Sequence, residues 1–140
     1  MPHDNVIAQL SRHGIQPSAQ RVAVGEYVLS TDEHPSADRV FTKVKKTLPV
    51  LSRATVYNTL NLFVNRGLLR QLVLAEGRVV FDPNLSPHHH FVDEATGRIF
   101  DVPWDKLEVK KVGSLEEDFE ISEYQVVMRG RRLPKRVKMA

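Results

Sequence analysis

Residues 51–82 read LSRATVYNTLNLFVNRGLLRQLVLAEGRVVFD, and this stretch decides the fold. Ser52 is a good N-cap for a helix over about residues 53–66. Two apolar stretches follow at 68–74 and 78–82, and the short sequence between them is typical of a hairpin turn. A capped helix followed directly by a hairpin predicts the winged form of the helix-turn-helix.

The outward face of the capped helix carries side chains that can read DNA. Its expected buried stripe contains Val56, Leu60 and Phe63. Polar and aromatic residues lie on or near the other face: Arg53, Tyr57, Asn58 and Asn61. In the major groove, Arg can bind guanine or phosphate and Asn can bind adenine. The alternative is a helical bundle whose surface is simply polar.

Shorter helices are expected before the capped helix, at residues 5–13, 19–29 and 35–46. Ser18 is a good N-cap for the second of these, and Pro35 suits the first turn of the third. Helices followed by strands predict an α+β chain that begins with a winged-helix DNA-binding domain.

The pattern changes to strands beyond Pro87. Strands are expected at 89–93 and 98–102, a helix at 104–112 and a last strand at 119–128. About fifty residues of this kind can hardly form a stable core alone. We therefore expect a small α/β dimerisation domain that gains burial from a second copy, so that a homodimer presents two reading helices to a palindromic or AT-rich operator.

The predicted division of the chain has four parts. These are a winged-helix DNA-binding domain at 1–83, a hinge at 84–87, a dimerisation and metal-sensing domain at 88–128 and a basic, disordered tail at 129–140. The hinge is expected where proline, asparagine and serine cluster, and the tail where arginine and lysine are crowded without an acid.

A run of three histidines, His88 to His90, is the strongest chemical signal in the chain. In an extended run, His88 and His90 point to one face and His89 to the other. Asp82 precedes the run and Asp101 follows it on the next expected strand. Two imidazoles with carboxylates on neighbouring strands predict a divalent-metal site, while the alternative is a solvated histidine loop.

Composition limits the classes of function. The chain has 140 residues, 26% of them charged, a net charge of +3 and no cysteine. The lack of cysteine excludes disulfides and thiolate zinc sites, so a metal must be held by histidine and carboxylates. No apolar run approaches the roughly 20 residues of a membrane span, and we expect a cytoplasmic protein with no membrane partner. The basic balance allows nucleic acid as a partner.

Four stretches together resemble the ferric uptake regulator superfamily of bacterial metal-dependent repressors. They are Gly14 to Arg21, His34 to Asp38, Leu51 to Leu60, and Phe81 through His90. The sequence of the third stretch, and the triple histidine in a chain without cysteine, are most similar to the iron response regulators of this superfamily. The peroxide-sensing branch shares the same pattern of metal ligands.

The resemblance implies a regulatory metal site and a mechanism by which the bound metal changes the shape of the dimer. The family's ligands match His34, Asp82, His88, His90 and Asp101. Such a nitrogen and oxygen site suits Fe(II) or Mn(II) in the cell, and Zn(II) on purification, better than Ca(II). A metal bound by residues of both halves would fix the angle between them and thereby favour one dimer shape.

The resemblance also implies the DNA contacts. Tyr57 matches the recognition-helix tyrosine of the family, and Arg21 matches a residue expected near the DNA backbone or minor groove. The other contacts implied are Ser52, Arg53, Thr55 and Asn58. The alternatives are that Arg21 is a surface charge and that Tyr57 packs against the hinge.

The sequence departs from the family pattern in three respects. The paired Cys-x-x-Cys motifs, whose four thiolates hold a structural zinc, are absent. A second site, for a further metal or for haem, keeps His89 and Glu108, with Tyr124 in place of an expected histidine. No Cys-Pro motif for haem is present, which leaves only a histidine contact to haem.

The function implied is a dimeric transcriptional regulator of iron-homeostasis genes that responds to Fe or Mn, and to haem if the iron response branch applies. It is a binding protein and not an enzyme. The first alternative is a peroxide sensor in which Fe(II) catalyses oxidation of His34 or His90. Outside the family, the alternatives are a non-haem iron oxygenase and a zinc-loaded DNA-binding protein that senses nothing.

Overall fold

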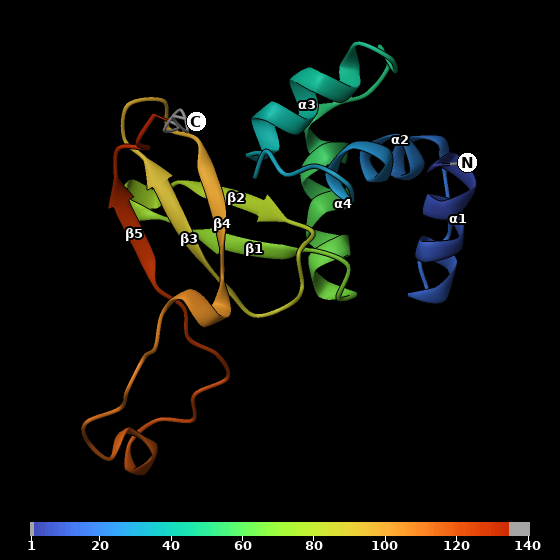
Figure 1. The fold of residues 1–140 in the computed structure, drawn as a ribbon. Coiled ribbons are helices and arrows are strands. Elements are labelled where there is room, and N and C mark those ends of the chain that lie inside the picture. The colour runs from blue at the N-terminus through green and yellow to red at the C-terminus, as the bar shows by residue number, and fades with distance from the viewer. Residues whose placement is uncertain (1, 135–140) are drawn as a thin grey trace, which may run out of the picture. The chain divides into compact units, whose positions relative to one another are not determined.

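The computed structural model describes residues 2–134, with side chains from residue 5 onward. The chain divides into two compact units, residues 1–85 and 86–140. The predicted hinge at 84–87 includes this point of division. The predicted α+β class is confirmed, since the described residues form α-helices and two sheets (Figure 1).

The first unit contains all the α-helices of the described residues and one hairpin. Its elements are α1 (Pro2–Arg12), α2 (Ala19–Val28), α3 (Ala37–Lys45), α4 (Arg53–Asn65), β1 (Arg70–Val73) and β2 (Val79–Asp82). The two strands pair antiparallel, with Arg70 opposite Asp82. Between them, Glu76 takes a left-handed conformation at φ 64° in a short 3-10 turn. A helical unit that ends in a two-stranded wing agrees with the predicted sequence of elements.

Serine caps begin the three helices that follow α1. Ser18, Ser36 and Ser52 each accept a hydrogen bond from the backbone N–H three residues later. Each cap satisfies an N–H group that has no partner within its helix. The helices then bury one face each around a common core that includes Leu10, Val24, Val28, Val40, Val56, Leu60 and Phe63.

The second unit contains a three-stranded sheet. Its strands are β3 (His88–Asp93), β4 (Ile99–Pro103) and β5 (Val127–Gly130), in the order β4-β3-β5. β3 pairs antiparallel with β4 and parallel with β5. The central strand therefore carries all three consecutive histidines of the chain.

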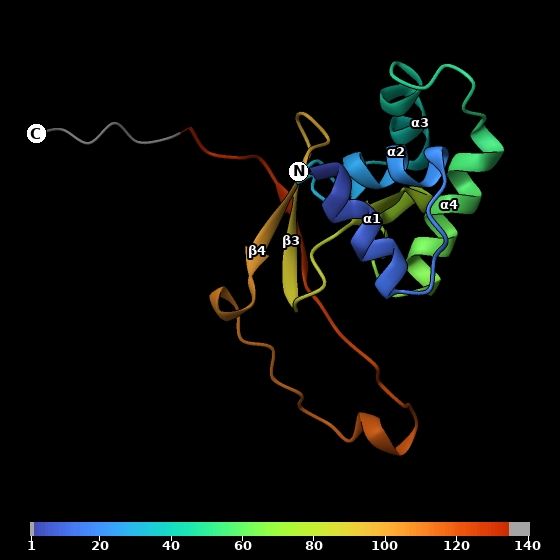
Figure 2. The ribbon, with the colours of Figure 1, turned by 90° about the vertical axis from the view of Figure 1, so that its right-hand side faces the viewer.

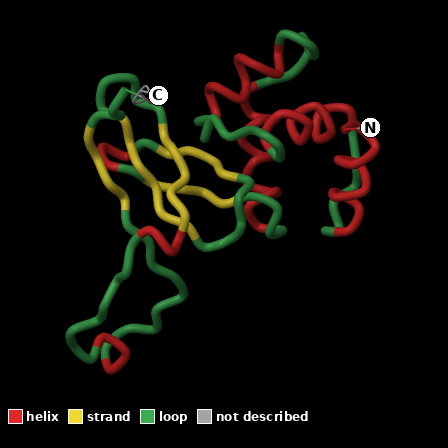
Figure 3. The backbone as a smooth tube through the Cα atoms, viewed as in Figure 1, coloured by secondary structure: helices red, strands yellow, loops and turns green. Residues whose placement is uncertain are grey.

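The predicted helix at 104–112 and most of the predicted strand at 119–128 are wrong. Only the 3-10 turn Trp104–Lys106 follows β4, and a second short turn and loop lead to β5 (Figure 3). The segment runs out from the sheet and returns (Figure 2). Its apolar side chains are exposed, Val112 by 97% and Phe119 by 63%. Trp104 at one end stacks on His89, and Gln125 and Val126 at the other end bond to β3, but the exposed residues between them offer no buried face to hold a helix or a strand.

The predicted tail begins too early. Arg129 and Gly130 belong to β5, where they pair with Val92 and Asp93 of β3. Hydrogen bonding to a buried central strand outweighs the local basic composition that predicted a tail from residue 129. The end of the predicted tail, residues 135–140, lies outside the described residues.

No helix among the described residues is long and apolar enough to cross a membrane.

The core of the first unit provides a stability test. Phe63 is fully buried on α4, so Phe63→Ala should lower the free energy of unfolding by about 3–5 kcal/mol. Val50 is 80% exposed, and Val50→Ala should change this free energy by less than about 0.5 kcal/mol. Denaturant titration measures both values. Equal, small effects would contradict the described core.

Candidate functional site

Three potential metal ligands meet in the second unit. His88 and His90 lie on one face of β3, and His90 is directly opposite Asp101 on β4. The Nε2 atoms of the two histidines are 2.9 Å apart. Asp101 Oδ1 lies 3.2 Å from His88 Nε2 and 3.4 Å from His90 Nε2. Strand alternation, which predicted that these histidines share a face, accounts for this convergence.

Neighbouring oxygens determine which ring nitrogens carry protons. His88 Nδ1 lies 2.6 Å from the backbone oxygen of Ser86, and His90 Nδ1 lies 2.7 Å from Gln125 Oε1. Both oxygens can only accept, so each Nδ1–H donates, and a ring that carries no other proton presents a lone pair at Nε2. Two lone pairs and a carboxylate oxygen then face one another. A shared cation would relieve their repulsion.

The spacing of these atoms also fits a coordination sphere. Ligand atoms bonded at about 2.1 Å from a metal are roughly 3.0 Å apart at a right angle and roughly 3.4 Å apart at a tetrahedral angle. The separations within the His88, His90 and Asp101 set are 2.9, 3.2 and 3.4 Å. Imidazole and carboxylate donors of this kind suit Fe(II), Mn(II) or Zn(II).

A second pair of potential ligands lies in the first unit. His34 Nε2 is 3.4 Å from Asp82 Oδ2, and both side chains are buried. The backbone N–H of Asn84 donates to the other carboxylate oxygen over 2.9 Å and thereby orients Asp82. Burial of a carboxylate beside an imidazole requires compensation of its charge, by a proton on the ring or by a cation.

The loop before α3 holds His34 in a left-handed conformation, with φ at 51°. This conformation is uncommon for any residue other than glycine. The loop is tied on both sides, since the Phe81 N–H donates to Pro35 O over 2.9 Å and the Tyr27 hydroxyl donates to Glu33 Oε1 over 3.1 Å. The latter bond lowers the pKa of the Glu33 carboxyl. Both ties position the imidazole beside Asp82.

The third histidine has different surroundings. His89 is fully buried on the other side of β3, where Nδ1 accepts from the Val126 N–H over 3.0 Å. Its ring stacks on Trp104 at 4.5 Å between centroids, and Trp104 in turn lies 5.2 Å from Tyr124. His89 Nε2 is buried without a hydrogen-bond partner among the described residues. Glu108, predicted to share a second site with it, lies in the exposed segment after the turn.

The residues of α4 and its cap that were predicted to contact DNA divide into two groups. Arg53, Tyr57 and Asn58 are exposed on α4. Ser52 and Thr55 instead bond to each other at the helix start, since Ser52 Oγ accepts from the Thr55 N–H over 3.1 Å and donates to Thr55 Oγ1 over 2.9 Å. In this structure they therefore cap the start of α4.

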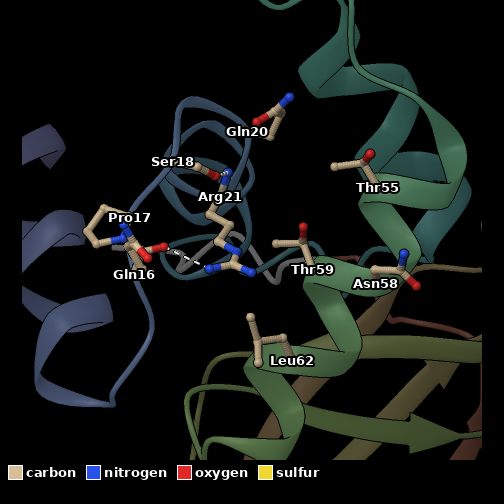
Figure 4. Close-up of a pocket in the computed structure, with 9 residues that line it drawn as sticks. All are labelled: Gln16, Pro17, Ser18, Gln20, Arg21, Thr55, Asn58, Thr59 and Leu62. Atoms are coloured by element: carbon tan, nitrogen blue, oxygen red, sulfur yellow. Dashed lines mark hydrogen bonds between the residues drawn. The ribbon is translucent and has the colours of Figure 1, made fainter.

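A polar pocket lies between α2 and α4, with a volume of about 450 Å³. Arg21 reaches into it from α2, and its guanidinium donates to Gln16 O over 2.9 Å (Figure 4). Asn58 and Thr59 line it from α4. The pocket brings Arg21 near α4, although the two are more than thirty residues apart in sequence.

The sequence alone did not indicate the roles of some residues that shape the site. Gln125 and the Ser86 carbonyl orient the two histidines, Trp104 stacks on the third, and Asp38 pairs with Arg53. No sequence signal marks Gln125 or a backbone carbonyl. Asp38 belongs to one of the four stretches that resemble the family. Apart from its place in the first turn of α3, nothing in the local sequence indicates its contact with Arg53.

Comparison with known proteins identifies relatives. The sequence profile of the Ferric uptake regulator family matches residues 12–129. The peroxide-responsive repressor PerR of Staphylococcus epidermidis is 30% identical over 125 residues, which are 89% of this chain and 83% of that protein.

Solved structures share the fold. The ferric uptake regulator of Pseudomonas aeruginosa with manganese has a TM-score of 0.68 at 24% identity, covering 91% of this chain and 97% of that one. The Campylobacter jejuni peroxide stress regulator has a TM-score of 0.62 at 22% identity, covering 94% of this chain and 96% of that one. At these identities, the likeness concerns the fold alone.

The cap of α4 can be tested separately from DNA contact. Ser52→Ala should lower the free energy of unfolding by about 1 kcal/mol because it removes the acceptor for the Thr55 N–H. Ser52→Asp keeps an acceptor, so it should retain stability while its added negative charge weakens DNA binding. Thermal unfolding and fluorescence anisotropy measure the two effects. Unchanged stability of Ser52→Ala would contradict the capping role.

Proposed function

The chain belongs to the ferric uptake regulator family, and from this membership we propose how its own residues perform metal-dependent regulation. Members of the family are transcriptional regulators that bind DNA as dimers. The prediction of a metal-dependent regulator is therefore confirmed, and the iron oxygenase alternative is wrong.

We propose that one divalent cation takes ligands from both units: His34 and Asp82 from the first, and His88, His90 and Asp101 from the second. The observation that carries this proposal is the convergence of lone pairs on β3 and β4 at coordination spacing. The pair in the first unit has the same spacing, 3.4 Å, but too few donors to complete a site alone. When bound, the ion supplies positive charge and a fixed link between the two ligand sets.

The consequence for DNA follows from the fold of the first unit. Arg53, Tyr57 and Asn58 would meet base edges from α4, and Arg21 would bind the backbone or minor groove beside it. A fixed angle between the units sets the distance between the two reading helices of the dimer. A palindromic operator with matching half-sites then binds the metal-loaded form best.

We propose Fe(II) or Mn(II), which the imidazole and carboxylate donors suit, as the metal in the cell, and iron-homeostasis genes as the target. Zn(II) would bind the same donors during purification. Without cysteine, the thiolate-bound structural zinc of other members has no ligands here, so dimer stability rests on packing. The exposed apolar side chains between β4 and β5 supply a surface for that packing.

We propose that a further metal or haem, if it binds, uses His89 Nε2. This atom is buried and lacks a hydrogen-bond partner in the described chain. Because this atom is buried, access requires that the side chains around the ring move. Tyr124 is beside Trp104 and could supply a second contact after that movement.

The central test compares DNA binding in three states. Fluorescence anisotropy on an iron-gene promoter fragment at fixed salt should show tight binding by Mn(II)-loaded protein and weak binding after chelation. Addition of haem to the Mn(II)-loaded protein tests the haem response directly. His88→Ala should abolish the Mn(II) effect because it removes one converging lone pair.

A matched control is His13→Ala, which removes an imidazole outside both ligand sets and should behave as the native chain. The His13 ring bonds within its own helix turn, to Gln9 O, and the backbone oxygen that accepts from Arg66 is kept in the variant. Equal binding by chelated and Mn(II)-loaded protein would show that the histidines do not regulate DNA binding, and would contradict the proposal.

The second candidate function is a peroxide sensor, favoured by the similarity to a peroxide-responsive repressor. In this case, His34 or His90 would gain one oxygen atom when Fe(II)-loaded protein meets peroxide, and would lose metal affinity. Peptide mass spectrometry should then show the mass of one added oxygen on these residues with Fe(II) but not with Mn(II). Unmodified peptides after Fe(II) and peroxide would exclude this function.

A further inference from the structure

One carboxylate contacts the reading face of α4. Arg53 Nη1 donates to Asp38 Oδ1 over 2.6 Å, and the Tyr57 hydroxyl donates to the same oxygen over 3.4 Å. The Arg53 guanidinium also lies over the Phe41 ring, 4.5 Å from its centroid. Two side chains expected to read DNA are thus held by one acidic residue of α3.

Stability does not explain this arrangement. Arg53 is the first residue of α4, next to the positive end of the helix dipole, where a cation is disfavoured. The Arg53 and Asp38 side chains are 59% and 67% exposed. An ion pair with this exposure adds little to the free energy of folding. Its main effect is to restrict where the guanidinium and the phenol can point.

The restriction has a direct consequence for DNA recognition. An unpaired arginine at the DNA face binds phosphates of any sequence, whereas a fixed guanidinium presents its planar fork in one direction. The Asp38 carboxylate also repels phosphate, which lowers sequence-independent attraction. Both effects raise the preference for the operator over other DNA.

We propose that Asp38 is a positioning residue for sequence recognition, which acts through Arg53 and Tyr57. The inference rests on the proposed DNA-binding function. Asp38 lowers total affinity for DNA and orients the two side chains for base contacts. It does not itself touch the operator.

The test is Asp38→Asn in the full Mn(II)-loaded protein. Anisotropy is measured on the promoter fragment and on a scrambled duplex of equal length, each over a series of salt concentrations. The scrambled duplex should bind more tightly, with a salt slope steeper by about one because Arg53 gains a phosphate. The ratio of promoter to scrambled affinity should fall roughly tenfold.

Two further variants show whether Asp38 acts as proposed. Glu26→Gln removes an equal charge from an exposed site on α2 and should leave the ratio unchanged. In an Arg53→Gln background, Asp38→Asn should lower the ratio by less than in the native background, because its main partner is already gone. Thermal unfolding checks that each variant remains folded.

The outcomes separate the inference from the proposed function. A native protein without preference for the promoter would overturn both. A native protein with a preference that Asp38→Asn retains would overturn the inference alone. An equal loss in Glu26→Gln, or a full additive loss in the Arg53→Gln background, would show a general charge effect and also overturn it.

Discussion

The contact between His88, His90 and Asp101 is the constraint on which the functional architecture depends. Two imidazole lone pairs and a carboxylate oxygen meet within 3.4 Å because an i, i+2 pair on β3 faces its antiparallel neighbour on β4. The Ser86 carbonyl and Gln125 keep the protons on the far side of each ring. The register of the sheet therefore brings these potential metal ligands together.

The two potential metal ligands of the first unit belong to the domain proposed to read DNA. His34 lies in a constrained loop directly before α3, and Asp82 ends the wing. Asp38, in the first turn of that same helix, contacts Arg53 and Tyr57 on α4. A short, well-packed segment thus joins a predicted metal ligand to the side chains expected to meet bases.

Local signals predicted the parts of the fold that local interactions determine. Serine caps marked the starts of α2 and α4, and alternation marked β3, because both patterns act within a few residues. The segment 104–126 could not be predicted in this way. Its charged and apolar residues resemble a helix and a strand, but apart from the contacts of Trp104, Gln125 and Val126 with β3 these residues are largely exposed in the described chain.

The site was predictable only in part for the same reason. The histidine run and the two flanking carboxylates are visible in sequence, whereas His34 is an isolated residue that only the family resemblance identified. The roles of Gln125 and Asp38 arise from contacts across 35 and 15 residues. Neither the hydrophobic periodicity nor the spacing of residues in the sequence indicates contacts between residues so far apart.

The central claim is that one ion takes ligands from both units, and a metal competition titration tests it most directly. Mn(II) affinity would be measured against a chelator of known affinity for the native chain, His34→Ala and His88→Ala. We expect one ion per chain and at least about tenfold weaker binding in both variants, since each removes a proposed ligand of the same ion. Native affinity in His34→Ala would mean that the second unit binds the ion alone and that the ion does not link the two units.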